Sequence, residues 1–154
     1  STPQRVIAPP KQQYLIVDGY NMIFAWDELK ALANEDLDAA RQRLMDTLAN
    51  YASYKQCRLV LVFDGYKVKG NRGTTFDYHS IQVVFTKENE TGDMYIEKLI
   101  QEIGRNFAVR VATSDGMEQV IILGHGALRV SARMFHQEVQ DVEKEIKRYI
   151  QGEA

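Results

Sequence analysis

The chain has 154 residues, of which 45% are hydrophobic and 26% charged, and this composition is typical of one ordinary globular domain and excludes extensive disorder. No apolar run approaches the roughly 20 residues needed to span a bilayer, and no basic-then-apolar leader opens the sequence. The single cysteine cannot form an internal disulfide. We therefore expect a cytoplasmic protein. The formal net charge of −2 argues against general affinity for nucleic acid, although carboxylates that bind metal ions also lower it.

Strands and helices are predicted to alternate along the chain. Residues 1–13 contain the Pro9-Pro10 pair and few apolar side chains, and we interpret them as a linker or the tail of an upstream domain, followed by one domain over residues 14–151. Strands are predicted at residues 14–17, 58–63, 80–85 and 107–112. Helices are predicted at residues 19–26, 27–33, 36–54, 92–105 and 115–123, and from the Ser131 cap onward. Residues 65–76, rich in Gly, Lys, Arg and Thr, are predicted to form a surface loop.

The predicted strands indicate the fold class. Runs such as Leu59 to Phe63 are apolar without alternation, which is typical of strands buried on both faces of a parallel sheet. Helices must then cover both faces. We therefore predict an α/β fold, a three-layer α/β/α sandwich with a mainly parallel central sheet, Rossmann-like topology and right-handed crossovers.

Four aspartates stand where an apolar strand ends or a helix begins: Asp18, Asp64, Asp93 and Asp115. In open parallel sheets, ligands bind at the carboxyl ends of the strands. Carboxylates gathered there repel one another unless a cation lies between them. Oxygen ligands with little His or Cys indicate Mg²⁺ or Mn²⁺ rather than zinc. Each aspartate taken alone also fits a helix cap or a turn.

Such a site fits phosphoryl chemistry. Two divalent ions about 4 Å apart can activate a water and stabilise the leaving oxygen of an in-line displacement, with no covalent nucleophile and no histidine base. Asn21, three residues after Asp18, is a candidate for steering a phosphate or a metal-bound water, and a helix cap is the alternative.

Basic residues near the aspartates are candidates for binding an RNA backbone through its phosphates. They are Lys67, Lys69, Arg72 and Lys87, together with Arg129 and Arg133 farther along the chain. Tyr20, Tyr66 and Phe76 are candidates for stacking on bases. The alternative for the first group is an ordinary solvated loop.

Five segments carry a resemblance to a known family. They are Val17-Asp-Gly-Tyr-Asn21-Met, Val62-Phe-Asp-Gly65, Val83-Val-Phe-Thr-Lys-Glu-Asn-Glu-Thr-Gly-Asp93, Ala112-Thr-Ser-Asp115 and Gly124-His-Gly-Ala-Leu-Arg-Val-Ser-Ala-Arg133. In this order they resemble the YacP-type branch of the NYN domains, within the PIN-like nuclease superfamily, over about residues 14–149. The resemblance implies a PIN-like sandwich and a metal-dependent RNA endonuclease, and studied relatives are implicated in cleaving messenger RNA on the translating ribosome.

The resemblance also implies roles for single residues. Asp18, Asp93 and Asp115 correspond to the acidic metal site, and Asp64 joins them because its segment resembles the metal-binding strand end of flap-type nucleases. We therefore predict a Mg²⁺- or Mn²⁺-dependent endoribonuclease that acts on single-stranded RNA. A catalytically weak RNA- or ribosome-binding module remains open, as does a metal-dependent phosphatase, although Asp18-Gly-Tyr lacks the second Asp of a DxD arrangement.

Overall fold

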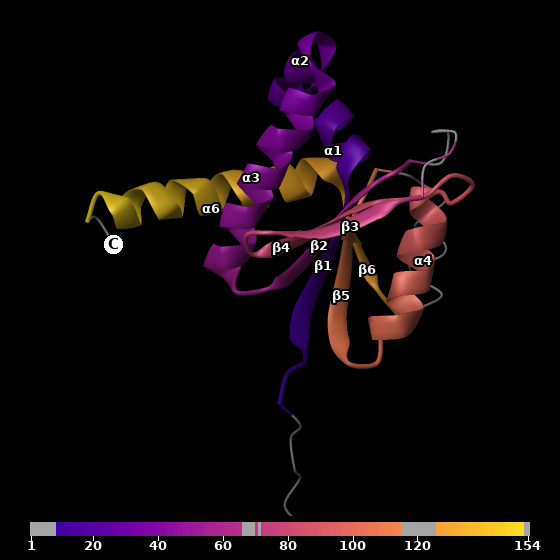
Figure 1. Cartoon of the computed structure of the whole chain (residues 1–154). Coiled ribbons are helices and arrows are strands. Elements are labelled where there is room, and N and C mark those ends of the chain that lie inside the picture. The colour runs from indigo at the N-terminus through magenta and orange to yellow at the C-terminus, as the bar shows by residue number, and fades with distance from the viewer. Residues whose placement is uncertain (1–8, 66–69, 71, 115–125, 153–154) are drawn as a thin grey trace, which may run out of the picture.

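The structure is a computed structural model and describes residues 9–65, 70, 72–114 and 126–152. Its strands are β1 (Gln12–Asp18), β2 (Arg58–Phe63), β3 (Thr74–Tyr78), β4 (Ile81–Phe85), β5 (Phe107–Ala112) and β6 (Leu128–Val130). Its helices are α1 (Gly19–Ala25), α2 (Asp27–Glu35), α3 (Leu37–Lys55), α4 (Gly92–Ile103) and α6 (Ala132–Ile150). The strands form one sheet in the order β3-β4-β2-β1-β5-β6 (Figure 1).

Neighbouring strands in this sheet run parallel, except for the antiparallel pair of β3 and β4. β1 lies at the centre, where Ile16 pairs with Val60 of β2 and Val111 of β5. All three side chains are fully buried. Central strands of this kind have no face in water, so the predicted three-layer α/β/α sandwich with a mainly parallel sheet is confirmed.

Helices cover both faces of the sheet (Figure 1). One face packs against α1, α3 and α6 through a cluster that includes Leu44 and Phe135. The other face packs against α4 through Ile96. Arg110 of β5 fastens α6 to the first face, because its guanidinium donates hydrogen bonds of 2.9 and 3.1 Å to the Glu138 carboxylate. None of the helices in the described ranges is long and apolar enough to cross a membrane.

The observed elements differ from the predicted ones mainly at the margins of the sheet. The prediction of a surface loop over residues 65–76 is wrong at its end, because β3 begins at Thr74 and pairs with β4. β3 is a polar edge strand, and its turn into β4 uses His79 at a φ of 50° instead of a glycine, so no turn dipeptide marks the hairpin. β1 begins at Gln12, two residues before the predicted start, and the short β6 has no counterpart among the predicted strands. The helix predicted over residues 115–123 lies outside the described residues.

The turn from β1 into α1 lies very close to the neighbouring strand. A Cβ atom built on Gly19 would lie 2.5 Å from the ring of Phe63. That ring is fully buried and stacks on Phe85 at 5.0 Å between centroids, so it has little room to withdraw. Only glycine therefore permits this approach of α1 to the sheet, and the approach in turn fixes where Asp18 lies.

Replacing Gly19 with Ala is expected to destabilise the fold by about 1–3 kcal/mol, because the added methyl group must displace a packed ring. Urea unfolding should show a lower midpoint with an unchanged slope. Gly92→Ala is the matched control, since Gly92 also opens a helix and a Cβ there would meet its nearest neighbour at an ordinary 3.6 Å. Equal stability of the two variants would show that the Phe63 ring yields to the methyl group.

Candidate functional site

Asp18 joins the end of β1 to the first turn of α1. Its Oδ1 accepts a hydrogen bond from the Asn21 backbone N–H at 3.4 Å, and its Oδ2 lies 3.5 Å from the Thr113 hydroxyl oxygen. The pKa of Asp18 is raised to about 6, chiefly because burial disfavours its charged form; hydrogen bonds from Asn21 lower the pKa, and the carboxylates of Asp93 and Asp64 raise it. Asp18 is therefore close enough to both other carboxylates to be affected by their charge.

Asp64 and Asp93 reach the same edge from β2 and α4. Asp64 directly follows β2, and its Oδ2 accepts a hydrogen bond from the Gly92 N–H at 3.1 Å. Gly92 is the first residue of α4, where N–H groups without helical partners and the helix dipole favour a carboxylate. Asp93 is the next residue and is partly buried. Asp64 thus anchors the start of α4 to the sheet, and this keeps Asp93 near Asp18.

Asn21 connects α1 to the end of β5. Its Oδ1 accepts hydrogen bonds from the Ser114 backbone N–H at 2.9 Å and from the Ser114 hydroxyl, and it lies 3.4 Å from the Thr113 hydroxyl oxygen. These contacts direct the amide NH2 group to the other side, where the Asn21 side chain lowers the pKa of Asp18 by hydrogen bonding. Asp115 follows Ser114 directly but lies outside the described residues.

The charge at this edge fits a divalent cation. Among the described residues, the groups that shift the pKa of Asp18 include two further carboxylates and no cationic side chain. A hard cation with oxygen ligands would relieve that repulsion, as Mg²⁺ and Mn²⁺ do. Within the described ranges, no three Asp, Glu, His or Cys side chains are grouped closely enough to hold a metal ion by themselves. The donors therefore fit the metal in type and charge, and a complete site needs a further ligand, for which Asp115 is the candidate.

Two of the predicted RNA-binding cations lie beside this edge. Arg72 is exposed just before β3, whose first residue pairs with Phe85 at the end of β4. Lys87 is exposed two residues after Phe85. Both cations therefore lie at the carboxyl end of β4. Lys67 and Lys69 lie outside the described residues.

Arg129 and Arg133 occupy different positions. Arg133 is exposed in the first turn of α6, which begins directly beyond β6. The end of β6 lies beside the end of β5, because the Thr113 N–H donates to the Val130 carbonyl at 3.1 Å. Arg129 lies within β6 opposite Val111 and is partly buried. Of the two, Arg133 is the better placed to meet a ligand at the carboxyl edge.

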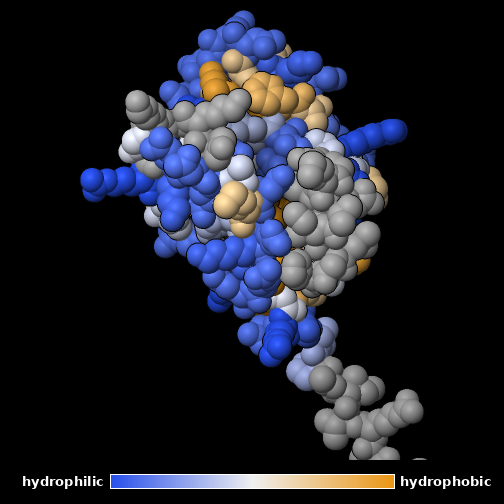
Figure 2. All heavy atoms as spheres, turned by 90° about the vertical axis from the view of Figure 1, so that its right-hand side faces the viewer, coloured by the Kyte–Doolittle hydropathy of each residue, from blue (hydrophilic) through white to orange (hydrophobic). Residues whose placement is uncertain are grey.

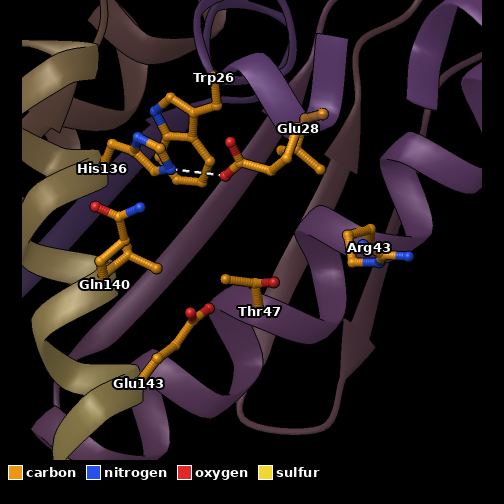
Figure 3. A pocket seen from close by; sticks show the side chains of 9 residues that line it. Trp26, Glu28, Arg43, Thr47, His136, Gln140 and Glu143 are labelled. Atoms are coloured by element: carbon orange, nitrogen blue, oxygen red, sulfur yellow. Dashed lines mark hydrogen bonds and ion pairs between the residues drawn. The ribbon is translucent and has the colours of Figure 1, made fainter. Parts of the chain in front are cut away.

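A separate cavity of about 180 Å³ lies between α2, α3 and α6, and its lining includes Trp26, Glu28, Arg43 and His136 (Figure 3). His136 Nε2 lies 2.6 Å from Glu28 Oε1, and the His136 ring stacks on Trp26 at 4.7 Å between centroids. The Trp26 indole N–H donates to the Ala132 carbonyl at 2.9 Å. These contacts fasten the start of α6 to α1 and α2. We interpret this cavity as a feature of helix packing, because its lining contains none of the candidate site residues that the structure describes.

Known proteins show the same fold. Residues 15–154 match the family model described as the YacP-like NYN domain. The chain is 47% identical over 138 residues to the Bacillus subtilis (strain 168) protein YacP, and the match covers 88% of this chain and 80% of that protein.

The chain belongs to the YacP-like NYN domain family.

Two crystal structures of Rae1 (YacP) from Bacillus subtilis are also similar to this NYN domain. One, of a mutant form, has a TM-score of 0.80 at 42% identity and is matched over 92% of this chain and 83% of its own. The other has a TM-score of 0.78 at 44% identity, over 90% and 80% of the two chains. The resemblance carried by the five sequence segments to the YacP-type NYN domains is thereby confirmed.

Two threonines that support the edge of this NYN domain were not among the predicted site residues. Thr86 and Thr113 are the buried polar side chains among the described residues, with exposed fractions of 1% and 0%. Each directly follows an apolar strand, β4 or β5. The Thr86 hydroxyl oxygen accepts a hydrogen bond from the Gly65 N–H at 2.7 Å and so fixes the backbone next to Asp64. Their signal in the sequence is a polar residue at a strand end, which is also common in ordinary turns.

Replacing Asp18 with Asn keeps a helix cap but removes one of the crowded charges. Without divalent cations, the variant is expected to be more stable than the parent by about 2 kcal/mol at pH 7.5, because the pKa of Asp18 in the folded protein is about 6 against an ordinary value of 3.8. The difference should shrink as the pH falls through 6 and vanish below about 4, where Asp18 is protonated in both folded and unfolded chains.

Thermal unfolding over this pH range, with and without Mg²⁺, measures the effect. Mg²⁺ should raise the Tm of the parent more than that of Asp18→Asn, since a ligand stabilises the state that binds it. Asp77→Asn is the control. Asp77 is exposed and pairs with Gln82 near the start of β4, whereas the candidate site lies at the carboxyl ends of the strands. If Asp18→Asn and Asp77→Asn change the Tm equally at pH 7.5, the negative charge of Asp18 does not destabilise the folded protein.

Proposed function

We propose that this NYN domain is a Mg²⁺- or Mn²⁺-dependent endoribonuclease that hydrolyses phosphodiester bonds in single-stranded RNA. The observation that supports the proposal most directly is that Asp18, Asp64 and the start of α4 meet at the carboxyl edge of a parallel sheet, where Asp64 Oδ2 accepts a hydrogen bond from the Gly92 N–H. Burial, together with the nearby carboxylates of Asp93 and Asp64, raises the pKa of Asp18 there, as is typical of sites that handle a cation or a proton. Membership in the YacP-like NYN family, with the segments that resemble PIN-like nucleases, favours RNA as the substrate.

Each residue of the site has a role in this proposal. Asp18, Asp93 and Asp115 would hold the metal, with Asp64 beside them, and the metal would supply activation of a water and stabilisation of the leaving oxygen. Asn21 positions the scissile phosphate: with its Oδ1 engaged by Ser114 and one N–H of its NH2 group on Asp18, the second N–H is the part that can donate to a phosphate oxygen. The hydrogen bond from the Gly92 N–H to Asp64 fixes the start of α4 and so maintains the distance between Asp93 and Asp18.

The RNA backbone is bound by cations around the edge. The proposal assigns this role to Lys67, Lys69, Arg72, Lys87, Arg129 and Arg133. Each phosphate that a cation neutralises releases a condensed counterion, and that release drives binding. The exposed positions of Arg72 and Lys87 at the carboxyl end of β4 support a path for the strand across that end of the sheet.

The first test of this function is the cleavage of single-stranded RNA with Mn²⁺ or Mg²⁺ under single-turnover conditions. Asp93→Asn is expected to lower the rate roughly a hundredfold or more, because the metal supplies most of the chemistry. Asp77→Asn, at the opposite edge, should cleave at the parental rate. An Asp93→Asn variant with the parental rate would remove Asp93 from the mechanism, and a parent that binds RNA but never cleaves it would favour the binding module.

We further propose that the substrate is messenger RNA on the translating ribosome. The chain has a formal net charge of −2, whereas non-specific affinity for RNA comes mainly from the neutralisation of phosphates. A domain with only local cationic patches therefore binds free RNA weakly. Efficient cleavage then needs a binding partner that brings the RNA strand to the site. The family resemblance nominates the ribosome for this role.

Cleavage in a reconstituted translation system, with and without an initiation inhibitor, tests this part of the proposal. We expect position-specific cuts in the translated message and much slower cleavage when initiation is blocked, because the strand is then not presented. The same RNA incubated with the domain alone sets the basal rate. Equal cleavage with and without the inhibitor would leave a ribonuclease that does not depend on translation.

A further inference from the structure

A row of five aromatic rings crosses the domain from β3 to α1. Phe76 stacks on Phe85 at 6.4 Å, Phe85 stacks on Phe63 at 5.0 Å, and Phe63 packs on Tyr20 at 5.1 Å between ring centroids. Tyr20 then stacks on Phe24 at 6.4 Å. The angles between consecutive ring planes are 17°, 26°, 53° and 30°, so most of the rings are close to parallel. We call these five residues the aromatic row.

The members of the aromatic row other than Phe24 are packed within the protein. Phe63 is fully buried, and Phe76 and Phe85 are partly buried. Tyr20 is held between Phe63 and Phe24, and its hydroxyl oxygen accepts a hydrogen bond from Arg41 at 3.2 Å. Tyr20 and Phe76, which the sequence nominates for base stacking, are therefore already engaged by protein rings.

Phe24 ends the row in solvent. Its exposed fraction is 52%, although each apolar ring left in water forfeits hydrophobic stabilisation. Figure 2 shows that apolar surface gathers over α1 and α2, at the top of the face that it presents. Since Tyr20 backs the ring of Phe24, the exposed aromatic surface is preorganised, and a ligand would lose little conformational freedom of the protein on binding.

The position of Phe24 relates it to the carboxylates. Asp18 caps α1, and Phe24 lies six residues farther along the same helix, about 9 Å along its axis. Asn21 precedes Phe24 by three residues, and residues three apart are neighbours on a helix surface. A single strand whose phosphate lies at Asn21 can therefore bring an adjacent base to Phe24.

We propose that Phe24 is a base-stacking subsite, on which a base within one or two nucleotides of the scissile phosphate stacks as the next ring of the aromatic row. The proposal rests on the proposed function and specifies how that site holds its substrate. Every base has a π face, so the subsite accepts purines and pyrimidines alike and selects for unpaired RNA, whose bases are free to stack. Phe24 is a positioning residue, since it contacts a base and not the reacting phosphate.

Binding of short single-stranded RNA, followed by fluorescence anisotropy in the Asp93→Asn background to prevent cleavage, tests the subsite. Phe24→Leu, which keeps an apolar side chain but loses the ring, is expected to weaken binding roughly tenfold, as the loss of one base–aromatic stack does. Phe24→Tyr should bind within about twofold of the Phe24 form. Tyr149→Leu is the matched control, because Tyr149 is 71% exposed at the far end of α6.

A scan with RNAs that each lack one base locates the partner of the ring. One abasic position is expected to weaken binding to the Phe24 form about as much as Phe24→Leu does, and to have no further effect in Phe24→Leu itself, because the two changes remove the same contact. Additive losses at every abasic position, or parental affinity in Phe24→Leu, would overturn the inference.

Cleavage by the chain with Asp93 intact separates this inference from the proposed function. If that chain cuts RNA while Phe24→Leu binds as tightly as Phe24, the stacking subsite is wrong and the nuclease stands. If ring-dependent binding is found but no cleavage occurs with either metal, the nuclease is wrong and the subsite stands.

Discussion

The partly buried carboxylate of Asp18, beside those of Asp93 and Asp64 at one edge of a parallel sheet, is the constraint around which this domain is organised. β1 and β2 run side by side in the same direction, so Asp18 and Asp64 must emerge at the same edge. α4 then brings Asp93 to the two of them. Burial is the largest cause of the raised pKa of Asp18, and repulsion from Asp93 and Asp64 adds to it. Charges of one sign are tolerated in such proximity only where packing elsewhere holds the elements in place, and the buried inner residues of the central strands supply that packing.

The contacts around the site counter that repulsion by fixing the backbone at the ends of the elements. The Gly92 N–H and the Asn21 N–H donate to two of the carboxylates, and both belong to first turns of helices, where the helix dipole favours negative charge. Gly19 allows α1 to start against Phe63 and so determines the position of Asp18. Because these contacts lie at the starts of α1 and α4, a small shift of either helix would change the spacing of the aspartates.

Much of this arrangement could be predicted from the sequence. Apolar runs such as Leu59 to Phe63 predict the buried parallel strands, and in a parallel sheet the residues that follow strands share an edge, so the sequence predicts that Asp18 and Asp64 approach each other. Features that depend on three-dimensional contact could not be predicted. Nothing in the sequence shows that Asp64 also binds the first N–H of α4, or that Thr113 supports Asn21, since both are contacts between segments far apart in the chain.

The hairpin and the aromatic row show two other limits of the sequence. β3 was missed because an edge strand needs partners on one side only, so its exposed Thr and Asp residues continue the polar run of the preceding loop and only Phe76 and Tyr78 face the core. Phe24 is one of six phenylalanines, and its local sequence resembles that of any amphipathic helix. Its exposure becomes evident only when Tyr20 and Phe63 are seen to fill the space beneath it. The positions of the aspartates in the sequence therefore indicated where negative charge gathers. Only the packing of the folded chain revealed that the ring of Phe24 is exposed to a ligand.

An acidic domain that acts on a polyanion must obtain part of its affinity from contacts that do not depend on charge. Cations such as Arg72 and Lys87 attract phosphates, but the carboxylates at the same edge repel them until a metal ion is bound. Base stacking is free of this conflict, because it involves the ring faces and not the backbone charge. An exposed ring on the helix that begins at Asp18 thus complements the metal site: the cation offsets the charge at the phosphate, and the ring holds the strand without adding to the repulsion.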